Sequence, residues 1–280
     1  MIDYLNVAPV YDWLRHPEWR DGPGTQGVLP GNDSGVELVA GVPSVMNAAL
    51  AAGAIDVSNV SSVAFGEHAR EWLLLPDLSV AAHGRVASVL LFSRHRDWSA
   101  LDGGSVAVTS DSATSVALVR LLCERRYGVS PRLVSRPPDL DAMLAAHDAA
   151  LLIGDIALRE GQARRPIGGA VPYIFDLAAE WQAWTGLPFV FSVWAARRDR
   201  AEAIRQGGVL ELLRTSTDWG LAHLDIIAAD AARRLNLPLA TCAAYLRLLD
   251  YALTERDLRG LRAFLELAVP GFAWEDVRWL

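Results

Sequence analysis

Residues 105–126 have the sequence SVAVTSDSATSVALVRLLCERR, and this stretch indicates the fold class. Its first five residues form a β-branched run that is typical of a buried parallel strand. A hydroxyl-rich turn follows, and apolar residues then recur at helical spacing until Tyr127-Gly128 closes the helix. A strand, a turn and a helix in this order predict an α/β protein.

The turn at residues 110–115 carries four hydroxyl side chains in six positions. A helix N-terminus has unpaired N–H groups and the positive end of the helix dipole, so it can hold a carboxylate or a phosphate. One serine or threonine is enough to cap a helix, however. The turn therefore has two interpretations, N-capping alone or an anion-binding site.

The composition is that of a globular chain long enough for two domains, with 280 residues and 52% hydrophobic content. We expect a cytoplasmic protein, because no apolar run reaches the ~20 residues of a bilayer span and no basic-then-apolar leader is visible. The net charge of −7 argues against nucleic-acid and anionic membrane partners. All 26 basic residues are arginine, which excludes Schiff-base lysines and the lysine of a P-loop.

The cysteines and histidines do not suggest a metal site. Cys123 and Cys242 lie in apolar helical patterns, which is typical of reduced core thiols. The six histidines show no HxxxH pairing and have no cysteine partners. The sequence also lacks a GxGxxG after a strand and a nucleophile elbow. We therefore expect no metal, no cofactor and no serine-hydrolase chemistry.

Polar residues follow other expected strands as well. Asn6 stands at the carboxyl end of a strand within residues 2–9, where Pro9 ends the pairing, although a turn-forming asparagine would also suit this place. Ser61 and Ser62 follow the next expected strand and start a helix that we expect to run to about residue 72. Ligands of open α/β sheets bind at the carboxyl ends of strands.

Two further positions join these candidates. Ser88 lies within the apolar run 86–92, where a serine usually bonds to nearby backbone, but the run precedes an expected domain crossover. Gly154-Asp155 closes the strand 149–153 at its carboxyl end. The candidate site residues around an interlobe cleft are Asn6, Ser61, Ser62, Ser88, Ser112, Thr114, Ser115, Gly154 and Asp155.

Two long apolar strands, 86–92 and 189–196, are each followed by basic residues and resemble paired crossovers between two lobes. We expect a discontinuous first lobe of residues 1–92 and 194–280, and a second lobe of residues 93–193. The chain after Asp199 has helical periodicity and is expected to pack on the first lobe. Residues 20–41 are rich in Gly, Pro, Asp and Ser and predict a surface excursion with one strand near 36–39.

In this order, the motifs resemble the chorismate dehydratases of the futalosine route to menaquinone, and the resemblance spans most of residues 1–200. The matching motifs are Tyr4-Leu5-Asn6 with Pro9, Asp56 with Ser61-Ser62, Gly84 with Ser88, residues 112–115, Pro137-Pro138-Asp139-Leu140, residues 152–155 and residues 184–191. The stretch at 20–41 is longer than the usual segment of the family.

The resemblance implies a two-lobed fold of the type II periplasmic-binding-protein kind with an interlobe cleft and C-terminal helices. It also implies a cofactor-free lyase that eliminates water from chorismate to give 3-[(1-carboxyvinyl)oxy]benzoate. Asn6 and Ser88 would be catalytic. The substrate-binding residues would be Ser61, Ser62, Ser112, Thr114, Ser115, Gly154 and Asp155.

Two alternatives stay open at this point. The dihydroxynaphthoate synthase of the same pathway is similar in fold but has a nucleophilic histidine directly after the strand that here ends in Ile153. This chain has Gly154-Asp155 there, and His147 lies upstream, so we prefer the dehydratase. A binding protein for a small carboxylate would have the same fold without chemistry. The sequence does not indicate the oligomeric state.

Overall fold

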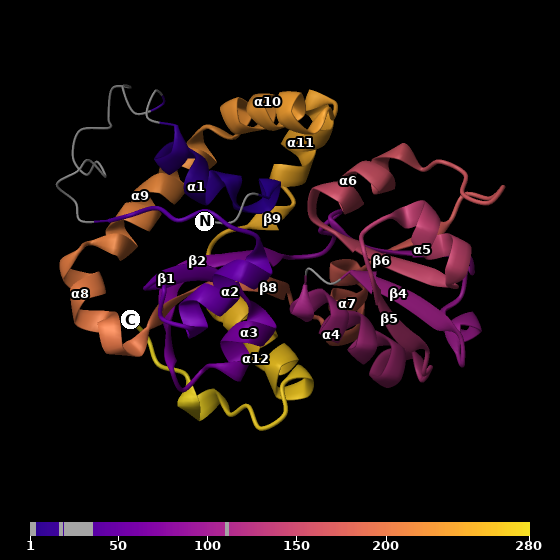
Figure 1. Cartoon of the computed structure of the whole chain (residues 1–280), viewed down its shortest axis with the longest axis horizontal. Helices are drawn as coiled ribbons and strands as arrows, with labels where there is room; N and C mark the ends of the chain where they lie inside the picture. The colour runs from indigo at the N-terminus through magenta and orange to yellow at the C-terminus, as the bar shows by residue number, and fades with distance from the viewer. Residues whose placement is uncertain (1–3, 17–18, 20–35, 110–111) are drawn as a thin grey trace.

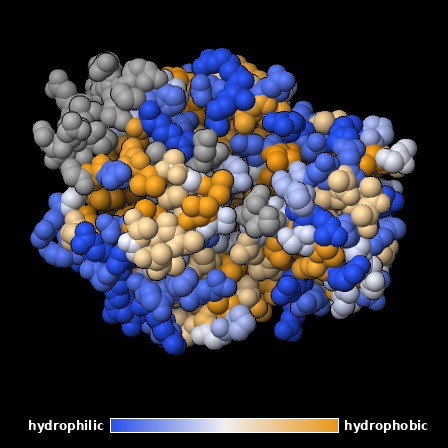
Figure 2. Space-filling model, viewed as in Figure 1, coloured by the Kyte–Doolittle hydropathy of each residue, from blue (hydrophilic) through white to orange (hydrophobic). Residues whose placement is uncertain are grey.

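The computed structural model describes residues 4–16, 19, 36–109 and 112–280 (Figure 1). The described residues form two β-sheets, each covered by helices, in two lobes that lie next to each other. This confirms the predicted two-lobed α/β architecture. No described helix is both long enough and apolar enough to cross a bilayer. Hydrophilic residues are spread over both lobes, with hydrophobic patches between them (Figure 2).

The first sheet is antiparallel and has the strand order β1-β8-β2-β9. Strand β8 is central and its apolar residues are buried, which explains why this segment of the sequence is almost continuously hydrophobic. The short strand β9 was not expected from the sequence. The strands are β1 (Val57–Ser61), β2 (Trp72–Ala82), β8 (Phe189–Arg197) and β9 (Leu249–Asp250).

The second sheet is mixed and has the strand order β5-β4-β6-β3-β7. Strand β4 pairs in parallel with β5 and β6, so the expectation of a buried parallel strand at residues 105–109 is confirmed. Strand β3 pairs antiparallel with β6 and β7. The strands are β3 (Val89–Ser93), β4 (Ser105–Thr109), β5 (Arg132–Arg136), β6 (Ala149–Ile153) and β7 (Tyr173–Asp176).

Helices cover both sheets, and the C-terminal run is helical as predicted. It breaks at Gly208 and Asn236, whose φ angles of 63° and 52° are left-handed and end a helix. The helices are α1 (Ala8–Arg15), α2 (Pro43–Ala51), α3 (Ser62–Glu67), α4 (Ala113–Leu121), α5 (Leu140–Ala146), α6 (Gly154–Ala163), α7 (Leu177–Thr185), α8 (Ala201–Gln206), α9 (Val209–Ala222), α10 (Leu224–Leu235), α11 (Leu239–Leu246) and α12 (Glu255–Ala268).

The lobe boundaries expected at 92/93 and 193/194 differ from the sheet membership of the strands. Strand β3 belongs entirely to the second sheet, and β8 belongs entirely to the first. The chain therefore crosses between the lobes at residues 83–88 and again at 186–188, after α7. Both strands are apolar because both are buried, and hydrophobicity alone does not reveal which sheet a buried strand joins.

The N-terminal segment also differs from expectation. Leu5–Val7 form a 3₁₀ turn, and α1 begins at Ala8, so Pro9 occupies the first turn of a helix, where its missing N–H is tolerated. Residues 1–3 and 20–35 lie outside the described residues. Residues 36–39 form no strand, and α3 ends at Glu67 because Trp72 already begins β2.

A close helix contact positions the N-terminal segment against the C-terminal helices. Gly220 of α9 lies against α1, where an added Cβ would come within 2.0 Å of the Pro9 carbonyl oxygen. Only glycine allows this approach. Ser216 Oγ donates to the Val10 carbonyl oxygen over 2.5 Å in the same interface. The sequence after residue 200 therefore supports the turn that carries Asn6.

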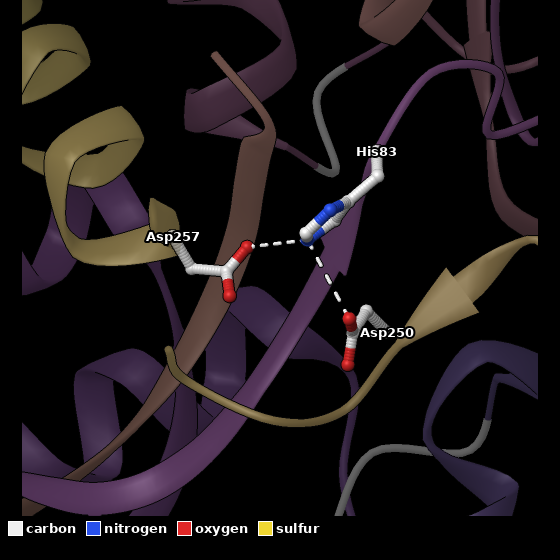
Figure 3. Close-up of side chains that lie close together, drawn as sticks. All are labelled: His83, Asp250 and Asp257. Carbon is white, nitrogen blue, oxygen red and sulfur yellow. Dashed lines mark hydrogen bonds and ion pairs between the residues drawn. The ribbon is translucent and has the colours of Figure 1, made fainter. Parts of the chain in front are cut away.

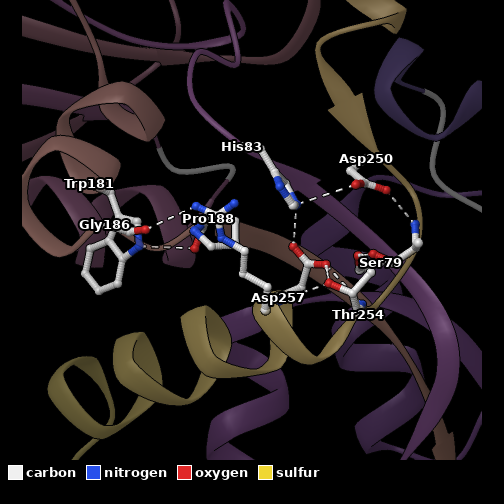
Figure 4. Close-up of polar contacts among 10 residues, drawn as sticks. Ser79, His83, Trp181, Gly186, Pro188, Asp250, Thr254 and Asp257 are labelled. Atoms are coloured by element: carbon white, nitrogen blue, oxygen red, sulfur yellow. Dashed lines mark hydrogen bonds and ion pairs between the residues drawn. The ribbon is translucent and has the colours of Figure 1, made fainter.

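Helix α12 contacts both crossovers. His83, at the start of the first crossover, has Nε2 2.8 Å from Asp257 Oδ1 and 3.5 Å from Asp250 Oδ2 (Figure 3). In the second crossover, Trp181 Nε1 donates to the Pro188 carbonyl oxygen over 3.2 Å (Figure 4). An added Cβ at Gly260 of α12 would lie 2.2 Å from the same oxygen, so the helix approaches this crossover very closely.

An aromatic cluster joins three elements at the second crossover. Trp181 of α7, Phe189 of β8 and Phe264 of α12 contact one another edge to face, with centroid separations of 5.6, 5.9 and 4.8 Å. All three side chains are almost fully buried. Such pairs contribute about 0.5–1.5 kcal/mol each beyond their area burial. The crossover is therefore part of the hydrophobic core.

Candidate active site

A cavity of about 180 Å³ lies between the two lobes and is lined by residues of both sheets. Among the described lining residues, none is charged. The first sheet contributes Asn59, Ser61, Val80, Phe191, Ser192 and Leu249, and the second lobe contributes Val89, Ser112, Ala113, Ser115, Ile153 and Gly154. A ligand in this cavity is held by neutral groups and would lie in contact with both lobes.

Helix N-termini supply the electrostatics of the cavity. Five of the described helices, α1, α2, α3, α4 and α6, begin at its wall. Their capping or first residues, Val7, Pro43, Ser61, Ser112 and Gly154, all line it. The N-terminal end of each helix carries partial positive charge, so several of them together favour an anion without any cationic side chain.

Six of the candidate residues named from the sequence line this cavity, namely Asn6, Ser61, Ser88, Ser112, Ser115 and Gly154. Ser112 caps α4, and its Oγ accepts a hydrogen bond from the Ser115 N–H over 3.1 Å. The two hydroxyl oxygens are also 2.9 Å apart. Capping and exposure to the cavity therefore coexist at this helix start, and the two interpretations of the turn are compatible.

The other three candidates do not line the cavity. Ser62 Oγ donates to the Val190 carbonyl oxygen over 2.7 Å within the first lobe. Thr114 Oγ1 accepts the Val63 N–H over 3.0 Å, and Asp155 Oδ1 accepts the Leu5 N–H over 3.3 Å. All three residues make contacts within the protein, and those of Thr114 and Asp155 join the two lobes. Their role in substrate binding stays a prediction.

Asn6 lies in the 3₁₀ turn before α1, and its Oδ1 atom is buried without a hydrogen-bond partner among the described residues. A buried acceptor without a partner costs roughly 1–3 kcal/mol. The side chain lines the cavity instead of closing the turn. Asn6 therefore contributes to the cavity wall, although its Oδ1 atom is buried and the turn that carries it is not a strand end.

The sequence predicted Ser88 inside a strand, but it lies in the first crossover, one residue before β3. Its neighbour Ala87 has a φ of 59°, and the Asp176 carboxylate accepts the N–H groups of Val86 and Ala87 at 3.0 and 2.7 Å. Burial raises the pKa of Asp176, and these hydrogen bonds oppose that rise. The Ser88 carbonyl oxygen accepts the Gly154 N–H over 2.7 Å. The backbone at Ser88 is therefore held from two sides.

The sequence analysis missed several polar residues of the cavity wall. Asn47 of α2 has a buried Oδ1 without a partner among the described residues, like Asn6. Asn59 Nδ2 donates to Ser192 Oγ over 3.0 Å across β1 and β8. A polar asparagine and a polar serine inside two apolar strands could have indicated Asn59 and Ser192 as residues of the cavity wall. No such signal marks Asn47, because nothing in the sequence of its helix indicates which face meets the cavity.

One group in the described part of the chain could offer three metal ligands, namely His83, Asp250 and Asp257. Its carboxylate oxygens already accept hydrogen bonds from the protein. Asp250 Oδ1 accepts the Ala252 N–H at 3.0 Å, and Asp257 Oδ2 accepts the Thr254 N–H at 3.0 Å. These contacts account for the group as an anchor of the crossover, and it lies outside the cavity.

Comparisons with known proteins identify the family of the chain. A family model described as menaquinone biosynthesis matches residues 1–270. The chain is 36% identical over 279 residues to a chorismate dehydratase of Thermus thermophilus, with 95% of this chain and 93% of the relative covered. It is 30% identical over 202 residues to a chorismate dehydratase of Campylobacter jejuni, with 71% and 67% covered.

Solved structures share the fold at low sequence identity. A protein of Archaeoglobus fulgidus has a TM-score of 0.71 at 17% identity, covering 96% of this chain and 94% of that one. The alkanesulfonate-binding protein of Xanthomonas axonopodis pv. citri has a TM-score of 0.60 at 14% identity, covering 98% and 94%. The fold is therefore the expected periplasmic-binding-protein-like fold. Together with the family match over residues 1–270, this shows that the chain belongs to the menaquinone biosynthesis family.

Proposed function

We propose that this protein is a chorismate dehydratase, a lyase that eliminates water from chorismate to give 3-[(1-carboxyvinyl)oxy]benzoate in menaquinone biosynthesis by the futalosine route. The observation that carries the proposal is the uncharged cavity ringed by helix N-termini. Chorismate is a dianion with two carboxylates, and such a cavity stabilises them without an ion pair. The relatives named chorismate dehydratase support the same assignment.

The start of α4 is the proposed binding site for the ring carboxylate. Ser112 and Ser115 face the cavity there, and the helix has no acidic residue in its first turn. The C3 hydrogen of chorismate is conjugated through a ring double bond to this carboxylate. Hydrogen bonds that stabilise extra charge on the carboxylate therefore acidify C3–H.

The proton acceptor in this scheme is the substrate itself. No described lining residue is an aspartate, a glutamate or a histidine. The enolpyruvyl carboxylate accordingly takes the C3 proton, and the electrons of the C3–H bond form the new ring double bond. The C4–O bond breaks with its electron pair, and the departing hydroxide and the proton together make water. Formation of the aromatic ring drives the step.

Asn6 and Ser88 are the proposed catalytic contacts. The side-chain amide of Asn6 lines the cavity and can form a hydrogen bond with the C4 hydroxyl group and orient it. The hydroxyl of Ser88 can donate to the same oxygen as negative charge develops on it. Both side chains lie on the cavity wall, and they come from the N-terminal turn and the first crossover. The elimination therefore depends on the positions of both the N-terminal turn and the first crossover.

The structure disfavours the dihydroxynaphthoate synthase alternative. The position after β6 is Gly154, with a φ of 64° and the ring of Tyr4 3.7 Å from where a Cβ would stand. His147 lies at the end of α5, with Nδ1 3.0 Å from Ser105 Oγ, and it does not line the cavity. No described histidine is therefore placed to act as the nucleophile.

Incubation of the purified protein with chorismate tests the proposal directly. We expect the ultraviolet spectrum of chorismate to be replaced by that of a substituted benzoate, with mass spectrometry showing loss of one water. Binding without conversion would indicate a binding protein for a small carboxylate instead of an enzyme.

The cytoplasmic location stays a prediction.

A further inference from the structure

We propose that Tyr245 is a positioning residue for this reaction, and that its phenol holds the Ser88 hydroxyl as a hydrogen-bond donor toward the substrate. The inference rests on the proposed function, which places Ser88 beside the departing oxygen. Tyr245 lies in α11, is 2% exposed and does not line the cavity. Its hydroxyl donates to Ser88 Oγ over 2.9 Å, so it lies directly behind a residue of the cavity wall.

This contact fixes the remaining freedom of Ser88. Its backbone is held by the Gly154 N–H and by the Asp176 carboxylate, which binds the two preceding N–H groups. The hydroxyl could still occupy any of three staggered rotamers about Cα–Cβ. The hydrogen bond from Tyr245 favours one of them. A helix near the C-terminal end thereby orients a side chain of the first crossover.

The direction of the hydrogen bond sets the role of Ser88. A serine hydroxyl has one hydrogen to donate and two lone pairs to accept with. Tyr245 uses one lone pair, and no described residue accepts the Ser88 hydrogen. That hydrogen is available to a ligand in the cavity. Donation from a phenol also polarises the serine O–H bond and makes it a better donor.

Tyr251 shows that burial alone does not impose such a contact. It is also 2% exposed and absent from the cavity wall, and its hydroxyl has no hydrogen-bond partner among the described residues. Burial raises the pKa of both phenols, so both stay protonated near neutral pH. The two tyrosines differ in one respect that matters here, because one of them bonds to Ser88. Tyr251→Phe is therefore a matched control for Tyr245→Phe.

The test is a double-mutant cycle with Tyr245→Phe, Ser88→Ala and the double variant, and with Tyr251→Phe as the control. Steady-state rates with chorismate and thermal melts are measured for each protein. Loss of the Tyr245 hydroxyl in Tyr245→Phe should lower kcat about tenfold and leave KM nearly unchanged. A tenfold loss of rate corresponds to about one hydrogen bond that is made in the transition state. In the Ser88→Ala background the same change should lower kcat less than about twofold, because its target is gone. The control should keep the kcat and KM of the parent.

Two results would overturn the inference. One is a Tyr245→Phe enzyme with the kcat of the parent. The other is an equal loss of kcat in the presence and in the absence of the Ser88 hydroxyl, which would mean that Tyr245 acts through packing. If Tyr245→Phe does not fold, a variant with 4-aminophenylalanine at position 245, which retains a hydrogen-bond donor at the same place on the ring, should fold and keep part of kcat. A folded but inactive variant of this kind would then overturn the inference in place of the first result.

The rate of the unsubstituted enzyme decides the proposed function separately. If it converts chorismate and the cycle is additive, only the inference fails. If it binds chorismate without converting it, the proposed function fails, and the inference fails with it, because the inference concerns the rate of the reaction. A protein that neither converts nor binds chorismate would overturn both.

Discussion

The N-termini of α4 and α12 have similar hydroxyl caps but different uses. Ser112 caps α4 with no acidic residue in the first turn, and the helix start faces the cavity. Thr254 caps α12 in a capping box with Asp257, whose carboxylate is fully buried and also meets His83 (Figure 4). An internal carboxylate satisfies the positive end of α12. The neutral cap of α4 leaves that end available to an anionic ligand.

The largest expected effect comes from giving α4 the charge of α12. Ser112→Asp keeps a good capping residue but places a carboxylate where the substrate carboxylate is proposed to bind. Two like charges about 4 Å apart repel by about 4 kcal/mol at a partly buried site, so kcat/KM should fall at least about 100-fold. The melting temperature should stay the same or rise, because aspartate is a strong N-cap.

Ser112→Asn is the matched control for that variant, since it caps without charge. It should keep kcat/KM within about tenfold of the parent. An aspartate variant as active as the asparagine variant would show that no anionic group of the substrate lies at α4.

The second prediction concerns the contribution of the α12 N-terminus to the stability of the protein. Asp257→Ala removes the capping interaction with Thr254 and the partner of His83, so the free energy of unfolding should fall by about 2 kcal/mol. Chemical denaturation measures this. Asp139→Ala, which removes an exposed cap of α5, should cost about 1 kcal/mol and serves as the control. A large loss of kcat in the folded Asp257→Ala protein would contradict a purely structural role for the start of α12.

The third prediction concerns the turn before α1, which shares the cavity with α4. Asn6→Ala removes a side-chain amide that lines the cavity, so kcat should fall about tenfold or more while the melting temperature stays nearly constant. Single-turnover assays and thermal melts on one preparation separate the two quantities. A turn-forming role would reverse the pattern, with reduced stability and full activity per folded molecule.

The smallest effect is expected where the two lobes meet. Thr114→Val removes the acceptor for the Val63 N–H, a contact worth about 1 kcal/mol, and should raise KM a few-fold by weakening closure of the lobes. Ser115→Ala removes a hydroxyl that faces the cavity and should change KM by a similar or larger factor. The Michaelis constant of each variant measures these effects. An unchanged KM for Thr114→Val would mean that this contact does not help to hold the lobes together.

Local patterns in the sequence determined the individual elements. A β-branched run predicted β4, and apolar residues at helical spacing predicted the helix after it and the helical character of the chain after Asp199. Hydroxyl residues after strands predicted part of the polar wall of the cavity, namely Ser61, Ser112 and Ser115. These features depend on neighbours a few residues apart, which is why they can be read from the chain.

Only the tertiary structure decided which elements belong together. Apolar strands are alike in composition, so the placement of β3 and β8 in opposite sheets depends on long-range pairing. Whether a hydroxyl points into the cavity or bonds to the protein depends on neighbours distant in sequence. The hydroxyl of Thr114, for example, accepts the Val63 N–H of the other lobe. Asn47 lines the cavity and Tyr245 bonds to Ser88 behind its wall, yet the sequences of their helices contain no sign of either contact. Burial and contact between distant segments are properties of the folded chain.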